Sequence, residues 1–171
     1  MREIASALLL IIGFLLQSTL FSQFTIGGIV PNILIIIVAS IGFLVSRRSG
    51  MLTGFFAGLL VDIFFGSVLG IYSLFYMYIG YLNGFFKKIL YSGDFKLPIM
   101  LIAISNLVYG HCCYFVFFLI KGDFNYSYYL VSIILPEVIY TTVLACIFYP
   151  FINYIFKKIA KREERFEDTI G

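Results

Sequence analysis

The chain has 171 residues, of which 61% are hydrophobic and only 12% are charged, with a net charge of +3. Soluble domains average about 45–50% apolar and about 25% charged residues, so this composition excludes a soluble globular protein. A mean hydropathy of +1.02 means that lipid must solvate much of the surface. The sequence therefore predicts an all-α integral membrane protein with one membrane domain.

Six hydrophobic segments are predicted to cross the membrane as helices. In chain order they cover residues 4–21, 31–46, 50–65, 69–86, 97–120 and 129–156. The first could instead be a signal peptide, but no Ala-x-Ala cleavage pattern follows it, so a retained span is favoured. Pro31 suits a helix start because its missing N–H would be unpaired there anyway. The last segment is long and is expected to bend near Pro136 or Pro150.

The loops between these segments are short. A tight turn around Gly66-Ser67 separates the third and fourth segments, which are therefore expected to be antiparallel neighbours. Residues 1–156 are predicted to form the six-span transmembrane domain. Residues 157–171 are predicted to form a short charged cytoplasmic tail, either near the lipid headgroups or disordered.

The basic residues give the orientation of the bundle. Eleven of the twelve Lys and Arg residues fall on one side of a six-span topology, and only Lys121 falls on the other. Basic residues near span ends stay cytoplasmic, so both termini are expected inside the cell. Five or seven spans would break this segregation. Because the basic residues follow the topology, nucleic-acid binding has no support.

A stripe of small residues runs along the third segment, where Gly50, Gly54, Gly58, Asp62 and Gly66 recur at every fourth position. A step of four residues advances 400° around a helix, so the stripe winds by about 40° per step. Small residues at this spacing let another helix approach closely. Two interpretations stay open, namely packing within the bundle and docking of a partner protein's helix.

Four polar residues within the predicted spans are candidates for a functional site: Asp62, Glu137, His111 and Asn106. The two acids and the histidine fall in the outer half of the membrane, where a polar cluster could act as a proton relay, a ligand pocket or a contact with a partner helix. The structural alternative is that Asp62 caps a neighbouring helix. Glu137, which follows a proline, would then satisfy backbone N–H groups that a bent helix frees.

The sequence predicts no enzyme, no metal site and no cofactor. His111, Cys112 and Cys113 are adjacent, so on a helix they point about 100° apart and cannot converge on one ion. No phosphate-binding loop, zinc-protease helix or serine-histidine-acid set is present.

Several motifs occur together in this chain. They are Pro31-Asn32, the basic pair Arg47-Arg48 before Gly50, Gly54-Phe-x-x-Gly58-x-x-x-Asp62, Gly66-Ser-x-Leu69-Gly70, Pro136-Glu137-Val138 and Tyr149-Pro150. The combination resembles the rod shape-determining protein MreD family, and the size, number and order of the segments match it over nearly the whole chain.

The resemblance implies a non-enzymatic part of the bacterial elongation machinery, in several passes through the cytoplasmic (inner) membrane. It implies a membrane-anchored MreC-like partner and, through it, links to the filament protein MreB, a class B penicillin-binding protein and the polymerase RodA. It also implies a fold similar to the six-helix substrate-binding subunit of energy-coupling-factor transporters.

Two functions therefore stay open. In the first, the chain is a scaffold that binds MreC within the membrane and helps to position peptidoglycan synthases to maintain rod shape. In the second, it is a small-molecule-binding membrane subunit of a transporter with an outward-facing pocket. Candidate pocket residues are Asp62, His111, Glu137, Tyr72, Tyr76, Tyr78 and Tyr81. Packing is favoured for the tyrosines, and short outer loops argue mildly against the transport function.

Overall fold

The computed structural model describes residues 2–23, 25, 28–66, 68–88, 95–122 and 125–170, and this part of the chain contains helices and no strands. The elements are α1 (Arg2–Leu15), the π turn η1 (Leu16–Leu20), α2 (Phe21–Gln23), α3 (Ile33–Leu44), α4 (Arg47–Phe65), α5 (Ile71–Asn83), the 3-10 turn η2 (Gly84–Lys88), α6 (Lys96–Lys121), α7 (Tyr126–Tyr129), the π turn η4 (Leu130–Ile134) and α8 (Leu135–Ile170). The predicted all-α class is confirmed.

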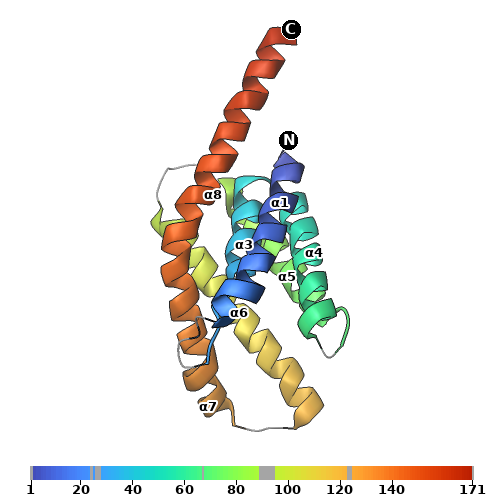
Figure 1. Ribbon diagram of the computed structural model, residues 1–171, viewed down its shortest axis with the longest axis vertical. Coiled ribbons are helices and arrows are strands. Elements are labelled where there is room, and N and C mark those ends of the chain that lie inside the picture. Colours follow the sequence, from blue (N-terminus) through green and yellow to red (C-terminus); the bar gives the residue numbers. More distant parts are fainter. Residues whose placement is uncertain are drawn as a thin grey trace.

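The helices run alternately up and down, and the two ends of the chain lie at the same end of the bundle (Figure 1). α1 and α4 begin at this end with Arg2 and Arg47, and α6 begins with Lys96. The arrangement has the antiparallel order that the basic residues predict. Following the orientation that the basic residues predict, we refer to this end as the cytoplasmic end and to the opposite end as the outer end.

α3 is the central helix of the bundle. Every residue from Ile33 to Phe43 is buried, and the neighbours of α3 include α1, α4, α5, α6 and α8. A helix that is apolar on all sides is stable only when protein or lipid surrounds it completely. Asn32 begins the helix, and its side-chain Oδ1 accepts a hydrogen bond from the backbone N–H of Ile35 at 3.2 Å.

Within the described part of the chain, four helices are long and apolar enough to cross a membrane: Arg2–Leu20, Arg47–Phe65, Lys96–Val116 and Tyr126–Glu163. α3 is strongly apolar but has only 12 residues, and α5 has 13. Helices of these lengths extend about 18–20 Å, which is less than the roughly 30 Å of the hydrocarbon layer. The membrane class is thus supported, whereas the count of six spans stays a prediction.

The polar end of α8 includes residues that the sequence analysis assigns to a charged tail, and the division at residue 156 stays a prediction. The helix continues without a break from Leu135 to Ile170 and projects beyond the rest of the bundle (Figure 1). The sequence predicts a separate tail here, but residues 157–170 consist largely of Lys, Arg, Glu, Ala and Ile and contain no Gly or Pro. Most of these residues favour the helical conformation and the others permit it, so the sequence contains no signal that would end the helix at residue 156.

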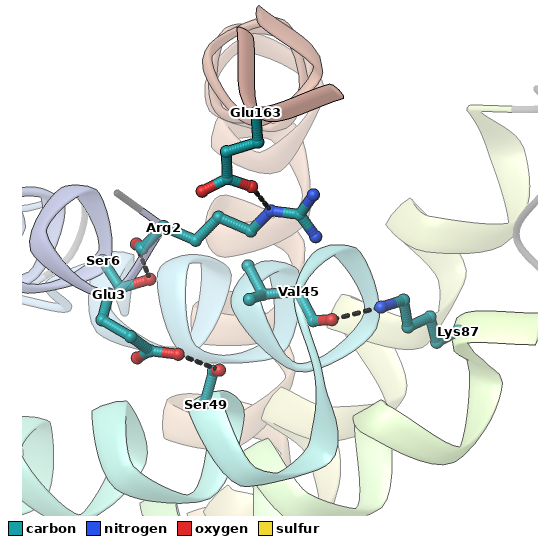
Figure 2. A network of polar contacts seen from close by, with 7 residues as sticks. All are labelled: Arg2, Glu3, Ser6, Val45, Ser49, Lys87 and Glu163. Carbon is teal, nitrogen blue, oxygen red and sulfur yellow. Dashed lines mark hydrogen bonds and ion pairs between the residues drawn. The ribbon is translucent and has the colours of Figure 1, made fainter. Parts of the chain in front are cut away.

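Polar contacts tie the helix ends together at the cytoplasmic end (Figure 2). Arg2 Nε lies 2.6 Å from Glu163 Oε2, which joins α1 to the projecting part of α8. Ser49 Oγ donates to Glu3 Oε1 at 2.5 Å and joins α4 to α1. The ammonium group of Lys87 donates to the backbone carbonyl of Val45 at the end of α3. These contacts tie α1 to α4 and α8, and η2 to the end of α3, at this end of the bundle.

Candidate functional site

The glycine stripe packs α4 against α5 of the same chain. At Gly50, Gly54 and Gly58, an added Cβ atom would lie closer than 3.0 Å to backbone atoms of α5, among them atoms of Tyr76 and Ser73. Only glycine allows this separation, because any side chain would force the two backbones apart. We call this α4–α5 contact at Gly50, Gly54 and Gly58 the glycine seam.

The members of the winding stripe pack against different helices. The nearest atoms to Gly50 come from Gly42 in α3 as well as from Gly80 in α5, whereas those nearest to Gly54 and Gly58 come from α5. Gly66 differs from the others, because it ends α4 in an extended conformation and its nearest atoms belong to the backbone of Asp62. The seam is thus internal packing between helices of this chain, whereas the atoms nearest to Gly66 belong to the end of its own helix.

Asp62 caps the first turn of α5. Its Oδ1 accepts from the backbone N–H of Tyr72 at 3.1 Å, and its Oδ2 accepts from the backbone N–H and the hydroxyl of Ser73 at 2.9 and 2.6 Å. The residue before α5 is Gly70, which has a φ of 101° and no side chain that could cap the helix. The carboxylate therefore satisfies N–H groups that would otherwise be unpaired at a positive helix end.

A buried polar network centred on Asn32 joins four helices. The hydroxyl of Tyr76 donates to Asn32 Oδ1 at 2.7 Å, and the backbone N–H of Asn32 donates to Thr141 Oγ1 at 2.9 Å. Tyr109 hydrogen-bonds Tyr76, and Glu137 lies close to the Asn32 side chain. Tyr76 is 1% exposed and Thr141 is 0% exposed. Buried networks of this kind fix the register of the helices that carry them.

The sequence did not reveal Asn32, Thr141 and Tyr109 as members of a site. Asn32 carried one usable signal, since asparagine after proline at a helix start is a typical N-cap. No sequence signal marks Thr141 or Tyr109, because their hydrogen-bond partners lie on helices that are distant along the chain.

The four predicted intramembrane polar residues do not form one cluster. Asp62 and Glu137 each lie close enough to Tyr72 to interact with it electrostatically. His111 lies elsewhere, with Nδ1 2.8 Å from the carbonyl oxygen of Leu107 and Nε2 2.8 Å from the hydroxyl of Tyr126. It thus links α6 to α7. Among the described residues, no group of three His, Cys, Asp or Glu side chains could hold a metal ion.

Asn106 is 1% exposed, and neither polar atom of its side chain has a hydrogen-bond partner within the described part of the chain. Leaving a buried amide unpaired costs about 1–3 kcal/mol. Asn83 offers a matched contrast, because it is also buried but its Nδ2 donates to Ile79 O and to Ser105 Oγ at 2.9 and 2.8 Å.

Replacing Asn106 by leucine is therefore expected to raise the thermal stability of the purified protein, because the substitution removes the unpaired amide and keeps a similar volume. Asn83→Leu is expected to lower the stability by about 1–3 kcal/mol, because it leaves Ser105 without a partner. Melting temperatures in one detergent measure both effects. A lower melting temperature for Asn106→Leu than for the unmodified chain would contradict the expectation.

A cavity of about 250 Å³ lies beside the polar network, toward the outer end of the bundle. Its lining residues come from α1, η1, α4, α5 and α6 and from the segment before α3. They are Phe14, Gln17, Ser18, Val30, Val61, Phe65, Tyr72 and Tyr109. Of the four tyrosines proposed for a pocket, only Tyr72 lines this one. Tyr76 belongs to the network, and Tyr78 and Tyr81 are exposed on the surface of α5.

The fold and this core define an all-helical membrane protein whose described polar groups mostly join one helix to another. The model of the rod shape-determining protein MreD family matches residues 1–159, and the chain belongs to this family. Comparisons with curated proteins and with solved structures gave no match. Family membership implies a role in rod shape determination, in association with the membrane and the cell-shape machinery. The similarity to the energy-coupling-factor subunit stays a prediction.

Proposed function

We propose that the chain is a non-enzymatic scaffold of the bacterial elongation machinery that binds an MreC-like protein within the cytoplasmic membrane. In this role it helps to position the class B penicillin-binding protein and the RodA-like polymerase, and it is linked indirectly to the MreB-like filament. The observation that carries the proposal is the family match over residues 1–159. The family is a structural one and is not known for an enzymatic activity.

The architecture supports this proposal because the bundle is held together internally. The glycine seam and the Asp62 cap both join α4 to α5, and the polar contacts at the cytoplasmic end join α1 to α4 and to α8. A scaffold needs such a fixed shape to hold partners at defined positions. Since α3 and α5 already fill the glycine seam, the helix of the partner would bind to an outward-facing surface.

Three helices offer apolar outward faces for this contact. On α8, Ile139, Val143 and Ile147 follow one another at intervals of four residues and are all exposed, and α1 carries Ile4, Leu8 and Ile11. Phe56 is exposed on α4. Lipid covers such faces where no protein does, so exposure alone does not select one of them.

Photo-crosslinking in native membranes tests the scaffold proposal and identifies the face. A photoreactive amino acid at Val143, Ile11 or Phe56 is expected to capture the single-span partner from one of the three helices. The same amino acid at Ala57, which is buried against the core, is the matched negative control. If no outward position captures the partner and the partner fails to co-purify with the chain, the scaffold proposal is wrong.

The transport alternative has weaker support. A solute would have to bind in the cavity beside the polar network, and most of the wall of this cavity is apolar. A polar solute usually needs several convergent polar groups to be recognised. A water-soluble molecule retained by the purified protein would favour this alternative over the scaffold.

A further inference from the structure

The wall of the cavity at the outer end is uncharged. Among its lining residues, only Gln17, Ser18, Tyr72 and Tyr109 are polar, and none carries a formal charge. Phe65, another lining residue, is 64% exposed, so the cavity reaches the surface of the bundle near the end of α4. An uncharged, largely apolar space at the surface of a membrane protein favours a hydrocarbon chain and offers nothing to neutralise a charged group.

Two hydrogen-bond donors in this wall remain available. Gln17 Oε1 accepts from the backbone N–H of Leu34 at 3.1 Å, so the amide is held in place, and its nitrogen has no acceptor within the described part of the chain. The hydroxyl of Tyr72 makes no hydrogen bond with the described part of the chain, although its backbone N–H is fixed by Asp62. The hydroxyl of Tyr109, in contrast, is engaged by Tyr76. A ligand with an acceptor oxygen would satisfy the free donors.

The backbone of the first helix departs from α-helical geometry at the cavity. The π turn η1 covers Leu16–Leu20 and contains two of the lining residues, Gln17 and Ser18. A π turn inserts one extra residue per turn and redirects the side chains around it, and such turns are frequent at functional sites. Here it coincides with the position from which Gln17 reaches both the first turn of α3 and the cavity.

We propose that this cavity binds one acyl chain of a glycerophospholipid from the outer leaflet, with the ester carbonyl of that chain accepting a hydrogen bond from the hydroxyl of Tyr72. A cavity of 150 Å³ holds a benzene ring, so about 250 Å³ holds roughly ten carbon atoms. This is enough for the upper half of an acyl chain. The headgroup stays outside, in the interfacial region, because the wall carries no charge.

The experiment compares two lipids and three variants. Full-length protein is purified in detergent, freed of lipid, and titrated with dioleoyl phosphatidylcholine or with its diether analogue, which lacks the ester carbonyls. Native mass spectrometry then measures the fraction of protein with one bound lipid. The variants are Tyr72→Phe, which removes only the hydroxyl; Val61→Trp, which fills the cavity; and Tyr78→Phe, a control on the exposed face of the same helix.

The unmodified protein and Tyr78→Phe are expected to bind the ester lipid about three- to tenfold more tightly than the diether, which corresponds to one hydrogen bond. Tyr72→Phe is expected to lose this preference, and Val61→Trp to bind both lipids weakly. Equal binding of the two lipids by the unmodified protein would overturn the proposal without any substitution being needed. A preference that survives in Tyr72→Phe would also overturn it.

Discussion

Replacing Gly58 by alanine is expected to destabilise the bundle more than the same change at a helical glycine whose added Cβ would meet a side chain. The new Cβ would meet the backbone of Tyr72 and Ser73 in α5. A backbone cannot rotate away as a side chain does, so α4 and α5 must separate along part of the seam. We expect a loss of about 2–3 kcal/mol in the free energy of unfolding, and Gly58→Leu is expected to leave almost no folded protein.

Gly110→Ala is the matched control for this substitution. Gly110 lies inside α6, and the atoms nearest to an added Cβ there belong to the side chain of Ile134, at 3.0 Å or more. Thermal unfolding in one detergent, followed by size-exclusion chromatography after heating, compares the two variants. Equal melting temperatures for Gly58→Ala and Gly110→Ala would show that the α4–α5 contact is looser than the structure indicates.

Replacing Asp62 by alanine is expected to cost about 3 kcal/mol or more in stability. The change leaves the backbone N–H groups of Tyr72 and Ser73 without acceptors inside the protein, and such unpaired buried groups are costly. Asp62→Asn keeps one acceptor oxygen and is expected to restore part of the lost stability. Thermal unfolding of the three proteins side by side gives the order Asp, Asn, Ala.

The same pair of variants separates a structural role of Asp62 from a proton relay. If the carboxylate only caps α5, partner co-purification is expected to fall in parallel with stability, and Asp62→Asn is expected to lie between the other two. A relay would instead require the ionisable group itself. Full loss of function in Asp62→Asn at nearly normal stability would contradict the capping role.

Local and compositional features of this protein were predictable, and contacts between distant helices were not. The basic residues predicted the common end of the two termini, and the short turn after α4 predicted that α4 and α5 are antiparallel. The sequence also offered internal packing as one meaning of the glycine stripe. It did not connect these two observations, although the turn makes α5 the nearest helix that could fill the seam.

The Asn32 network shows why the rest could not be predicted. Its members come from α3, α5, α6 and α8, and they meet only because these helices have one particular register. Periodicity within a single helix contains no information about this register. The end of α8 is ambiguous for another reason, since a mixed-charge segment is typical of a disordered tail although Lys, Arg and Glu individually favour helix.

The short central helix has a consequence for how the protein is made. α3 is about 18 Å long and is surrounded by α1, α4, α5, α6 and α8, all but the first of which follow it in the chain. When α3 leaves the ribosome, most of the protein that will surround it has not been synthesised. Its short length also leaves the polar backbone at its ends within the hydrocarbon layer, where lipid cannot satisfy it. We therefore expect the burial of α3 to depend on helices that are synthesised after it, above all on the α4–α5 hairpin.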